Sequence, residues 1–233
     1  MATDRLTPAQ LEELRQFDTC TVSNAIETFA VRLRNVGFAD SRIRCMFKDL
    51  PLPTVGYAAT ARVRTSLPPM YGQNYYDRTD WWNHIVQIPA PRFVVVEDVD
   101  QKPGIGSFVG EVHANILLAL GCLGLVTNGA VRDLPAVHAA GFQMFAGNVS
   151  VSHAFAHIFE FGSTVEVGGL KIRPGDLLHG DRHGILTIPL DIAARVPEVA
   201  RDLLDQERRI VEFCQSPDFS LEKLRETLKS LKR

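Results

Sequence analysis

The stretch from residue 92 to residue 146 constrains the fold more than any other feature of the chain. It alternates strand-like and helix-like segments: strands at Arg92–Val99, Leu123–Thr127 and Phe142–Ala146, with helices at Glu111–Leu120 and Leu134–Ala140. A strand, a crossover helix and a further strand favour parallel pairing with right-handed connections. The sequence therefore predicts an α/β fold built around a parallel sheet.

The segments before this stretch predict two N-terminal helices, a strand and a loop. Thr7 is a typical N-cap and Pro8 a typical first helical residue, so we expect a helix over Pro8–Phe17 and a second over Val22–Val31. Residues 32–55 look irregular, and small and β-branched residues predict a strand over Gly56–Arg64. An aromatic, turn-rich loop and a short helix near Trp81–Ile88 follow.

The segments after it predict more strands and then a helical C-terminus. Bulky residues alternate from Val149 to Phe161, which is typical of a strand. Asn128-Gly129 is a turn signal. Short strands are expected at Leu170–Arg173, Asp176–His179 and Ile185–Ile188, and helices at Ile192–Phe213 and Leu221–Lys232. We interpret residues 1–233 as one domain, with N-terminal helices at about 8–31 and a C-terminal helical extension at about 192–232.

Composition narrows the class of protein. The net charge is −2 and basic residues are dispersed, so we expect no nucleic-acid partner. No apolar run is long enough to span a bilayer and the N-terminus lacks an apolar signal segment, so we expect a cytoplasmic protein without membrane contact. Widely spaced cysteines predict free buried thiols, at Cys20, Cys45, Cys122 and Cys214.

A glycine-rich loop leads into the helix that begins at Glu111. Gly104, Gly106 and Gly110 allow close approach of a ligand, and the free amides of a helix start favour an anion such as a carboxylate. A tight strand-to-helix connection without a ligand explains the same glycines.

Arg132-Asp133 is the second candidate feature. The pair follows a strand and precedes a helix, at the carboxyl edge where open α/β sheets bind ligands. Arginine suits a carboxylate or a 2-oxo acid, and aspartate supplies a hard oxygen ligand for Mg²⁺ or Mn²⁺. A solvated surface pair, or Asp133 capping the following helix, is the alternative interpretation.

These residues resemble the acidic-x20-Arg-Asp signature of the family that contains 4-hydroxy-4-methyl-2-oxoglutarate aldolases and proteins like the regulator of ribonuclease activity A (RraA-like). The resemblance rests on Glu111 and Arg132-Asp133, and on the segments GEV at 110–112, LVTNGAVRD at 125–133, GFQMFA at 141–146 and RPGDLLHGDRHGILTIP at 173–189. It implies a layered β/β/α sandwich like the swivelling phosphohistidine domain, assembled as a homo-trimer or homo-hexamer with active sites between subunits.

The resemblance also implies roles for individual residues. Asp133 would bind the divalent metal (Mg²⁺ or Mn²⁺) directly, while Glu111 would hold metal-bound water. Arg132 would bind the oxo acid and stabilise enolate charge, beside Gly110 and the amides of Val112 and His113. A glutamate from the C-terminal helix of an adjacent subunit would complete the site, with Glu207 as the first candidate and Glu198 as the second.

The implied activity is that of a class II pyruvate aldolase. Such a lyase cleaves a C–C bond of a 4-hydroxy-2-oxo acid, releases pyruvate and also decarboxylates oxaloacetate, because both reactions pass through the pyruvate enolate. Two alternatives stay open: a non-catalytic inhibitor of ribonuclease E, and a related lyase or isomerase of sugar-acid catabolism. Departures from the family pattern leave the aldol substrate open: Glu111, His113, Asn128 and the loop Tyr71–Trp82.

The remaining histidines have weaker signals. His153 and His157 share one face of the expected strand, and we interpret both as structural. His179 and His183 flank a turn, where they could reach a ligand or simply hydrogen-bond within the turn. His138 is expected to be exposed.

Overall fold

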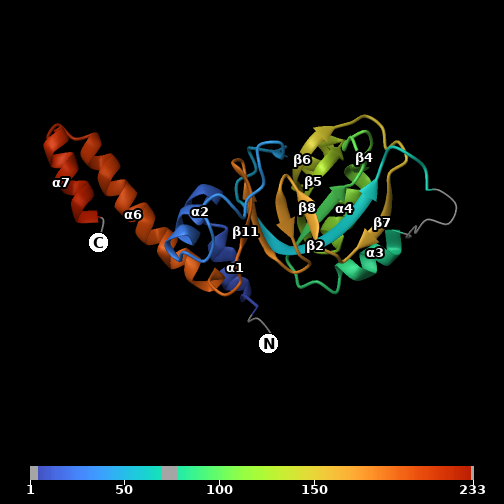
Figure 1. The fold of residues 1–233 in the computed structure, drawn as a ribbon, viewed down its shortest axis with the longest axis horizontal. Coiled ribbons are helices and arrows are strands. Elements are labelled where there is room, and N and C mark those ends of the chain that lie inside the picture. Colours follow the sequence, from blue (N-terminus) through green and yellow to red (C-terminus); the bar gives the residue numbers. More distant parts are fainter. Residues whose placement is uncertain (1–4, 70–77, 232–233) are drawn as a thin grey trace.

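The computed structural model describes residues 5–69 and 78–231 (Figure 1). The strands are β1 (Arg44–Cys45), β2 (Thr54–Arg64), β3 (Arg92–Asp98), β4 (Ser107–Val109), β5 (Cys122–Val131), β6 (Gln143–Val149), β7 (His157–Phe161), β8 (Val165–Val167), β9 (Leu170–Ile172), β10 (Leu177–Asp181) and β11 (Gly184–Ile188). The helices are α1 (Pro8–Leu14), α2 (Thr19–Thr28), α3 (Arg78–Ile85), α4 (Glu111–Ala119), α5 (Leu134–Ala139), η1 (Ala193–Arg195), α6 (Val196–Cys214) and α7 (Leu221–Leu231).

A mixed sheet forms the centre of the molecule. Its strand order is β1-β6-β5-β3-β2-β10-β11, and β4 and β7 pair with β5 and β2. The pairs β2–β3, β3–β5, β5–β6 and β4–β5 are parallel, and the other pairs are antiparallel. The predicted α/β fold with a parallel core and C-terminal helices is therefore confirmed, including parallel pairing of the three strands within residues 92–146.

Both faces of the parallel strands are covered, which explains the uninterrupted apolar run of β3. Val94 and Val96 pack with residues of α3, α4 and α5, whereas Phe93 and Val95 pack beneath the β8–β9 hairpin. A strand that is buried on both faces has no need of alternating polar residues. A third cluster joins α1, α2 and the start of α6 to β10 and β11.

The N-terminal helices begin at capped residues. Thr7 accepts a hydrogen bond from the Gln10 amide and Gln10 reciprocates, so the predicted cap of the first helix is confirmed as a capping box. The second helix begins at Thr19, three residues before the predicted start, because Asp18 accepts a hydrogen bond from the Thr21 amide at 2.7 Å.

The predicted turn at Asn128-Gly129 is wrong, because β5 continues through both residues to Val131. The pairing of β5 with β6 shifts between Thr127 and Ala130. At this irregularity the Asn128 side chain accepts from the Asp98 amide at 2.7 Å and donates to the Asp98 carbonyl at 2.9 Å. The side chain thus takes the place of a backbone partner, which lets the strand continue.

Asn128→Ala is therefore expected to lower the free energy of unfolding by about 2 to 4 kcal/mol, because it leaves a peptide amide and carbonyl of Asp98 without partners. Urea denaturation followed by circular dichroism measures the change, with the exposed Asn83→Ala as the matched control. Equal midpoints for the two variants would contradict this role of Asn128.

The predicted strand over residues 149–161 is also wrong in its larger part. Val149 is the last residue of β6, residues 150–156 are irregular, and His157–Phe161 forms β7. The bulky side chains of Val151 and Phe155 are exposed, so they do not form the buried face of a strand.

The prediction of buried thiols holds for Cys45 and Cys122 but not for Cys20 and Cys214, which are exposed. Burial raises the pKa of Cys122 to about 12.

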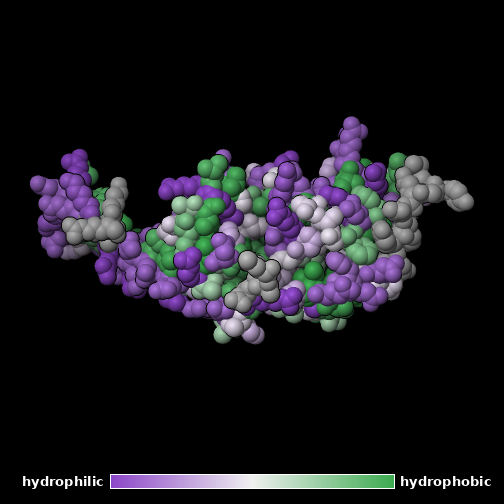
Figure 2. Space-filling view, turned by 60° about the horizontal axis from the view of Figure 1, so that its bottom comes forward, coloured by the Kyte–Doolittle hydropathy of each residue, from purple (hydrophilic) through white to green (hydrophobic). Residues whose placement is uncertain are grey.

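The C-terminal helices form an arm. The first half of α6 packs into the cluster with α1 and α2 through Val196, Val199, Ala200 and Leu203. The second half of α6 and all of α7 extend away from the sheet (Figure 1). Figure 2 shows the end of this arm as a largely hydrophilic projection. No helix within the described ranges is both long and apolar enough to cross a membrane.

Candidate functional site

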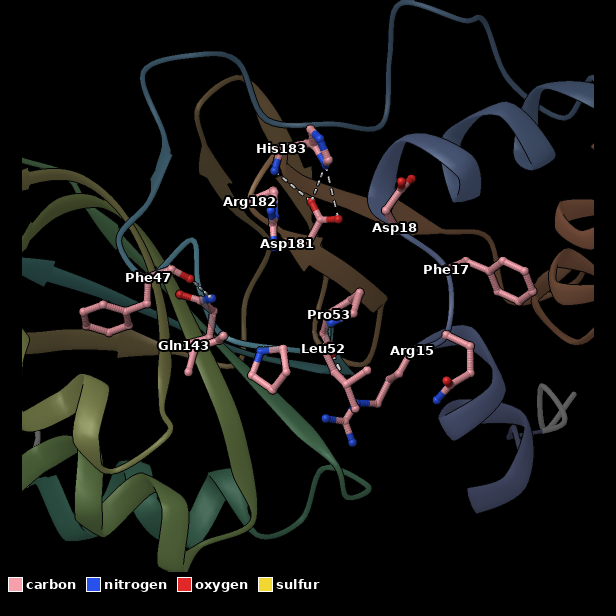
Figure 3. A pocket seen from close by; sticks show the side chains of 13 residues that line it. Arg15, Phe17, Asp18, Phe47, Leu52, Pro53, Gln143, Asp181, Arg182 and His183 are labelled. Atoms are coloured by element: carbon pink, nitrogen blue, oxygen red, sulfur yellow. Dashed lines mark hydrogen bonds and ion pairs between the residues drawn. The ribbon is translucent and has the colours of Figure 1, made fainter. Parts of the chain in front are cut away.

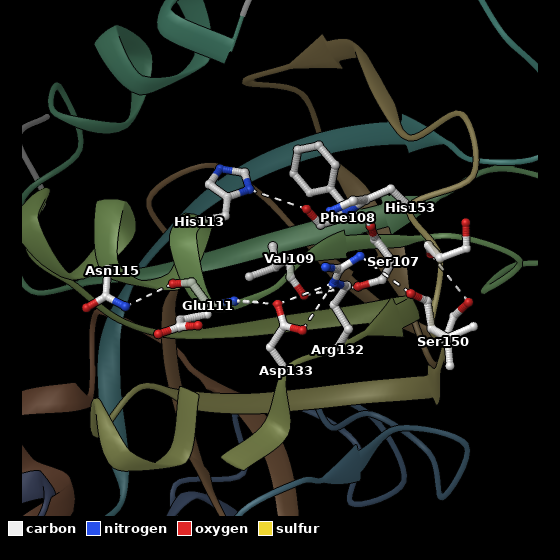
Figure 4. Close-up of polar contacts among 12 residues, drawn as sticks. Ser107, Phe108, Val109, Glu111, His113, Asn115, Arg132, Asp133, Ser150 and His153 are labelled. Atoms are coloured by element: carbon white, nitrogen blue, oxygen red, sulfur yellow. Dashed lines mark hydrogen bonds and ion pairs between the residues drawn. The ribbon is translucent and has the colours of Figure 1, made fainter. Parts of the chain in front are cut away.

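The candidate site lies where the start of α4 meets the end of β5. Gly110 connects β4 to α4, and Arg132-Asp133 connects β5 to α5 (Figure 4). Because β4 and β5 are paired, the two connections lie side by side. A Cβ atom on Gly110 would lie 2.3 Å from Asp133 Oδ2 and 3.0 Å from Arg132 Cγ. Only glycine therefore lets the two connections approach this closely.

Asp133 has an unusual backbone conformation and an unexpected hydrogen-bond partner. Its φ of 56° lies in the left-handed region, where aspartate is tolerated better than most residues. It occupies the N-cap position of α5, yet its side chain caps no amide of that helix. Asp133 Oδ2 instead accepts from the Glu111 amide at 3.0 Å, so Asp133 caps α4 across the site.

Arg132 and Asp133 form an ion pair that is partly open to solvent. Arg132 Nε donates to both carboxylate oxygens of Asp133 at 3.2 Å, and Nη1 lies 3.4 Å from the Val151 carbonyl. The hydrogen bond from the Glu111 amide, aided by Arg132, lowers the pKa of the Asp133 carboxyl. Asp133 is therefore anionic at neutral pH, as a hard cation requires.

The predicted site residues separate into two groups. Gly110, Glu111 and Val112 lie beside Arg132-Asp133, and Glu111 and Val112 are exposed. The Ala114 amide donates the first hydrogen bond of α4, to the Gly110 carbonyl. The amides of Val112 and His113 come before it in the chain, so the helix itself supplies them with no acceptor. The His113 side chain, by contrast, is buried and points away from Asp133 (Figure 4).

The distant glutamates lie outside this group. Glu198 and Glu207 are exposed on α6, which starts beside α1 and α2 and extends away from the sheet and α4 (Figure 1). One chain alone therefore does not bring either glutamate to Asp133. A contribution of Glu207 or Glu198 from an adjacent subunit remains a prediction.

The carboxylates at this site suit a metal ion that keeps several of its waters better than an ion that is coordinated by protein atoms alone. Within residues 5–69 and 78–231, no group of three or more His, Cys, Asp or Glu side chains could hold a metal ion. Asp133 offers an anionic oxygen donor and Glu111 an exposed carboxylate nearby. Mg²⁺ retains several waters and needs only one or two carboxylates, so these two residues fit it.

Residues 149–155 contribute an unpredicted wall of the site. Ser150 Oγ donates to the Ile105 carbonyl at 2.9 Å, and His153 Nδ1 lies 2.7 Å from the Ser107 carbonyl. The Val151 carbonyl of this wall lies 3.4 Å from Arg132 Nη1. The wall and the neighbouring segments carry exposed apolar side chains: Ile105, Val112, Val149, Val151 and Phe155. The only signal of this wall in the sequence was the alternation of bulky and smaller residues over 149–161. That alternation favours a strand, so the wall was not predicted.

Hydrogen bonds within the protein hold four of the other histidines: His138, His157, His179 and His183. His157 Nδ1 contacts the Phe155 carbonyl at 2.7 Å, in keeping with a structural role, and His138 pairs with the exposed Asp49. His179 is completely buried between Thr19 and the Leu14 carbonyl, so it lines no ligand site. His183 binds Asp181 in the β10–β11 turn, at the rim of a pocket of about 380 Å³ (Figure 3).

The predicted loop Tyr71–Trp82 is only partly a loop. Residues 70–77 lie outside the described part of the chain, whereas Arg78–Ile85 is helical and forms α3. Trp81 of this helix is fully buried and Trp82 is half-buried. The aromatic residues at the end of the predicted loop therefore belong to a helix that packs beside α4.

The chain is similar to known proteins. The family model "RraA-like: Aldolase/RraA" matches residues 19–187. A putative 4-hydroxy-4-methyl-2-oxoglutarate aldolase of Halalkalibacterium halodurans is 33% identical over 84 residues, which are 36% of this chain and 40% of that relative's length.

Two solved structures share the fold. An uncharacterized protein from Pseudomonas syringae has a TM-score of 0.75 and 24% identity, with 97% of each chain covered. RraAS2 of Streptomyces coelicolor, described as an unusual member of the RNase ES inhibitor RraA protein family, has a TM-score of 0.68 and 20% identity. That match covers 88% of this chain and 96% of RraAS2.

Proposed function

Because the chain belongs to the RraA-like family, we propose that it is a divalent-metal-dependent lyase. It cleaves a C–C bond of a 4-hydroxy-2-oxo acid to release pyruvate, and it decarboxylates oxaloacetate. The observation that carries this proposal is the joint position of an anionic Asp133, the Arg132 guanidinium and the first-turn amides of α4. An anionic cation ligand, a fixed positive charge and amide donors are what an enolate-forming reaction needs.

Asp133 would hold Mg²⁺ or Mn²⁺ directly, and Glu111 would hold it through water, as would Glu207 of an adjacent subunit. When bound, the ion would polarise the 2-oxo group as a Lewis acid. Partial exposure of Asp133 allows a hydrated ion to approach, and the fixed position of its carboxylate reduces the cost of binding.

Arg132 and α4 would bind and orient the substrate. Arg132 Nε is occupied by Asp133, which leaves the Nη side of the guanidinium for an oxo-acid oxygen. The amides of Val112 and His113 would receive the substrate carboxylate, favoured by the helix dipole. Arg132 would also offset the negative charge that develops on the enolate oxygen.

An assay with oxaloacetate tests the proposal. The purified protein is incubated with Mg²⁺ or Mn²⁺, and metal-dependent pyruvate release above the spontaneous rate is expected. A panel of 4-hydroxy-2-oxo acids with pyruvate detection then identifies the aldol substrate. No metal-dependent turnover of any of these acids would overturn the proposal.

The apolar wall around the site supports assembly of several copies. Val151 is 96% exposed and Val112 is 75% exposed, beside the polar groups of the site. Large exposed apolar side chains gathered in neighbouring segments favour an interaction surface. We therefore propose that a homo-trimer or homo-hexamer forms with subunits meeting at Arg132-Asp133, so that a C-terminal helix of one copy supplies Glu207 to another.

Val151→Asp is expected to shift the protein from an oligomer towards the 25.9 kDa monomer, because it places a charge in the proposed interface. Light scattering coupled to size-exclusion chromatography measures the mass. Leu33→Asp, at an exposed apolar residue elsewhere, should leave the mass unchanged. A wild-type protein that is monomeric at micromolar concentration would contradict the proposed assembly.

A further inference from the structure

His113 is a buried polar residue in the first turn of α4, beside the amides that are proposed to receive the substrate carboxylate. Its exposed fraction is 5%. Its ring packs edge-on against three aromatic rings, with centroid distances of 5.1 Å to Phe108, 5.5 Å to Trp81 and 6.1 Å to Trp82. A leucine would fill this place without burying polar nitrogens. Burial of the imidazole is therefore costly unless both ring nitrogens form hydrogen bonds.

The hydrogen bonds of His113 assign a single tautomer. Its Nδ1 lies 3.3 Å from the Phe108 carbonyl, and its Nε2 lies 3.4 Å from Trp82 Nε1. A carbonyl only accepts and an indole N–H only donates, so Nδ1 carries the proton and Nε2 accepts. A neutral imidazole with both nitrogens directed in this way connects three elements: β4, α3 and α4.

Side-chain contacts, rather than an N-cap side chain, hold the first turn of α4. Gly110 at the N-cap position has no side chain to cap the helix. The Glu111 amide is fixed by Asp133 on one side of the turn, and His113 fixes the other side. The Val112 amide lies between these two attachments and the His113 amide belongs to the second. The imidazole and Asp133 therefore set together where both N–H groups point.

We propose that His113, held by Trp82 and Phe108, is a positioning residue that sets the affinity of α4 for the substrate carboxylate. This inference rests on the proposed function, in which those amides bind a 2-oxo acid. It assigns α3 a part in substrate binding through Trp82. It also separates the residues of the site: His113 governs substrate affinity, and Asp133 governs metal affinity.

Oxalate, a small dicarboxylate related in shape to the pyruvate enolate, is the probe. Isothermal titration calorimetry measures its Kd in the presence of saturating Mg²⁺, and Mn²⁺ binding is measured separately. His113→Leu is expected to weaken oxalate binding and to raise the KM for oxaloacetate by about tenfold, since small displacements of binding groups have large effects. The kcat should fall less than about threefold, and Mn²⁺ affinity should stay within about twofold, because Asp133 does not move.

Trp82→Phe removes only the indole donor and should weaken oxalate binding by about fivefold, the effect of one neutral hydrogen bond. His113→Asn should recover part of the loss, because its amide can still donate to the Phe108 carbonyl. His183→Leu is the matched control, at an exposed histidine of the β10–β11 turn, and should bind oxalate like the wild type.

The outcomes are distinguishable. If the wild type binds oxalate and both Trp82→Phe and a folded His113→Leu bind it equally well, the positioning role is overturned while the proposed function stands. If His113→Leu does not fold, the comparison of Trp82→Phe with the wild type decides. A wild type that neither binds oxalate nor releases pyruvate overturns the proposed function and this inference with it.

Discussion

Asp133→Asn is expected to lower kcat/KM for oxaloacetate by about a thousandfold, the loss that removal of the anionic cation ligand should cause. The substitution keeps the shape of the side chain. Its amide oxygen can still accept from the Glu111 amide, the hydrogen bond that is 3.0 Å long in the structure. What it removes is the negative charge that opposes Arg132 and that attracts the metal.

Two measurements separate this effect from misfolding. Mn²⁺ titration should show binding to the wild type and a loss of at least about tenfold in affinity for Asp133→Asn, whereas the melting temperatures should agree within a few degrees. Asp218→Asn, at an exposed aspartate between α6 and α7, is the matched control. An Asp133→Asn protein that binds Mn²⁺ and turns over oxaloacetate like the wild type would exclude Asp133 as the metal ligand.

The parallel core and the neighbourhood of Arg132-Asp133 are predictable because both depend on local pattern and chain order. The apolar run of β3 and the helical segment of α4 are readable from composition, and parallel strands carry their following loops to one edge. Gly110 and Arg132 are adjacent in space for that reason. The resemblance to a family then gives the pair its chemical interpretation.

The missed features depend on partners that are distant in sequence. Asn128-Gly129 has the composition of a turn, but hydrogen bonds to Asp98 hold Asn128 within a strand. Residues 149–155 alternate like a strand, but Ser150 and His153 are bound by carbonyls of the 105–107 segment. No periodicity in one segment reports a hydrogen bond to a segment 30 to 46 residues away, so tertiary contacts override the local signal.

Gly110→Ala is the substitution that tests the close approach of the two connections. Gly110 has a φ of −130°, which any residue can adopt, so alanine meets no backbone obstacle. Its added Cβ would instead meet Asp133 Oδ2 at 2.3 Å and Arg132 Cγ at 3.0 Å. The Asp133 carboxylate must then leave the Glu111 amide, and a displacement of about 1 Å at a catalytic group lowers activity by about a hundredfold.

Gly141→Ala is the control that separates geometry at the site from the general effect of replacing a glycine. Gly141 has a φ of 74°, where alanine is strained, but a Cβ there would meet no atom within 4 Å. Gly141→Ala should therefore lose about 1 kcal/mol of stability and keep its oxaloacetate turnover, whereas Gly110→Ala should lose turnover with little change in its unfolding midpoint. Full activity of Gly110→Ala would show that Asp133 and Arg132 can act from other positions, because the added methyl group leaves their present positions no room.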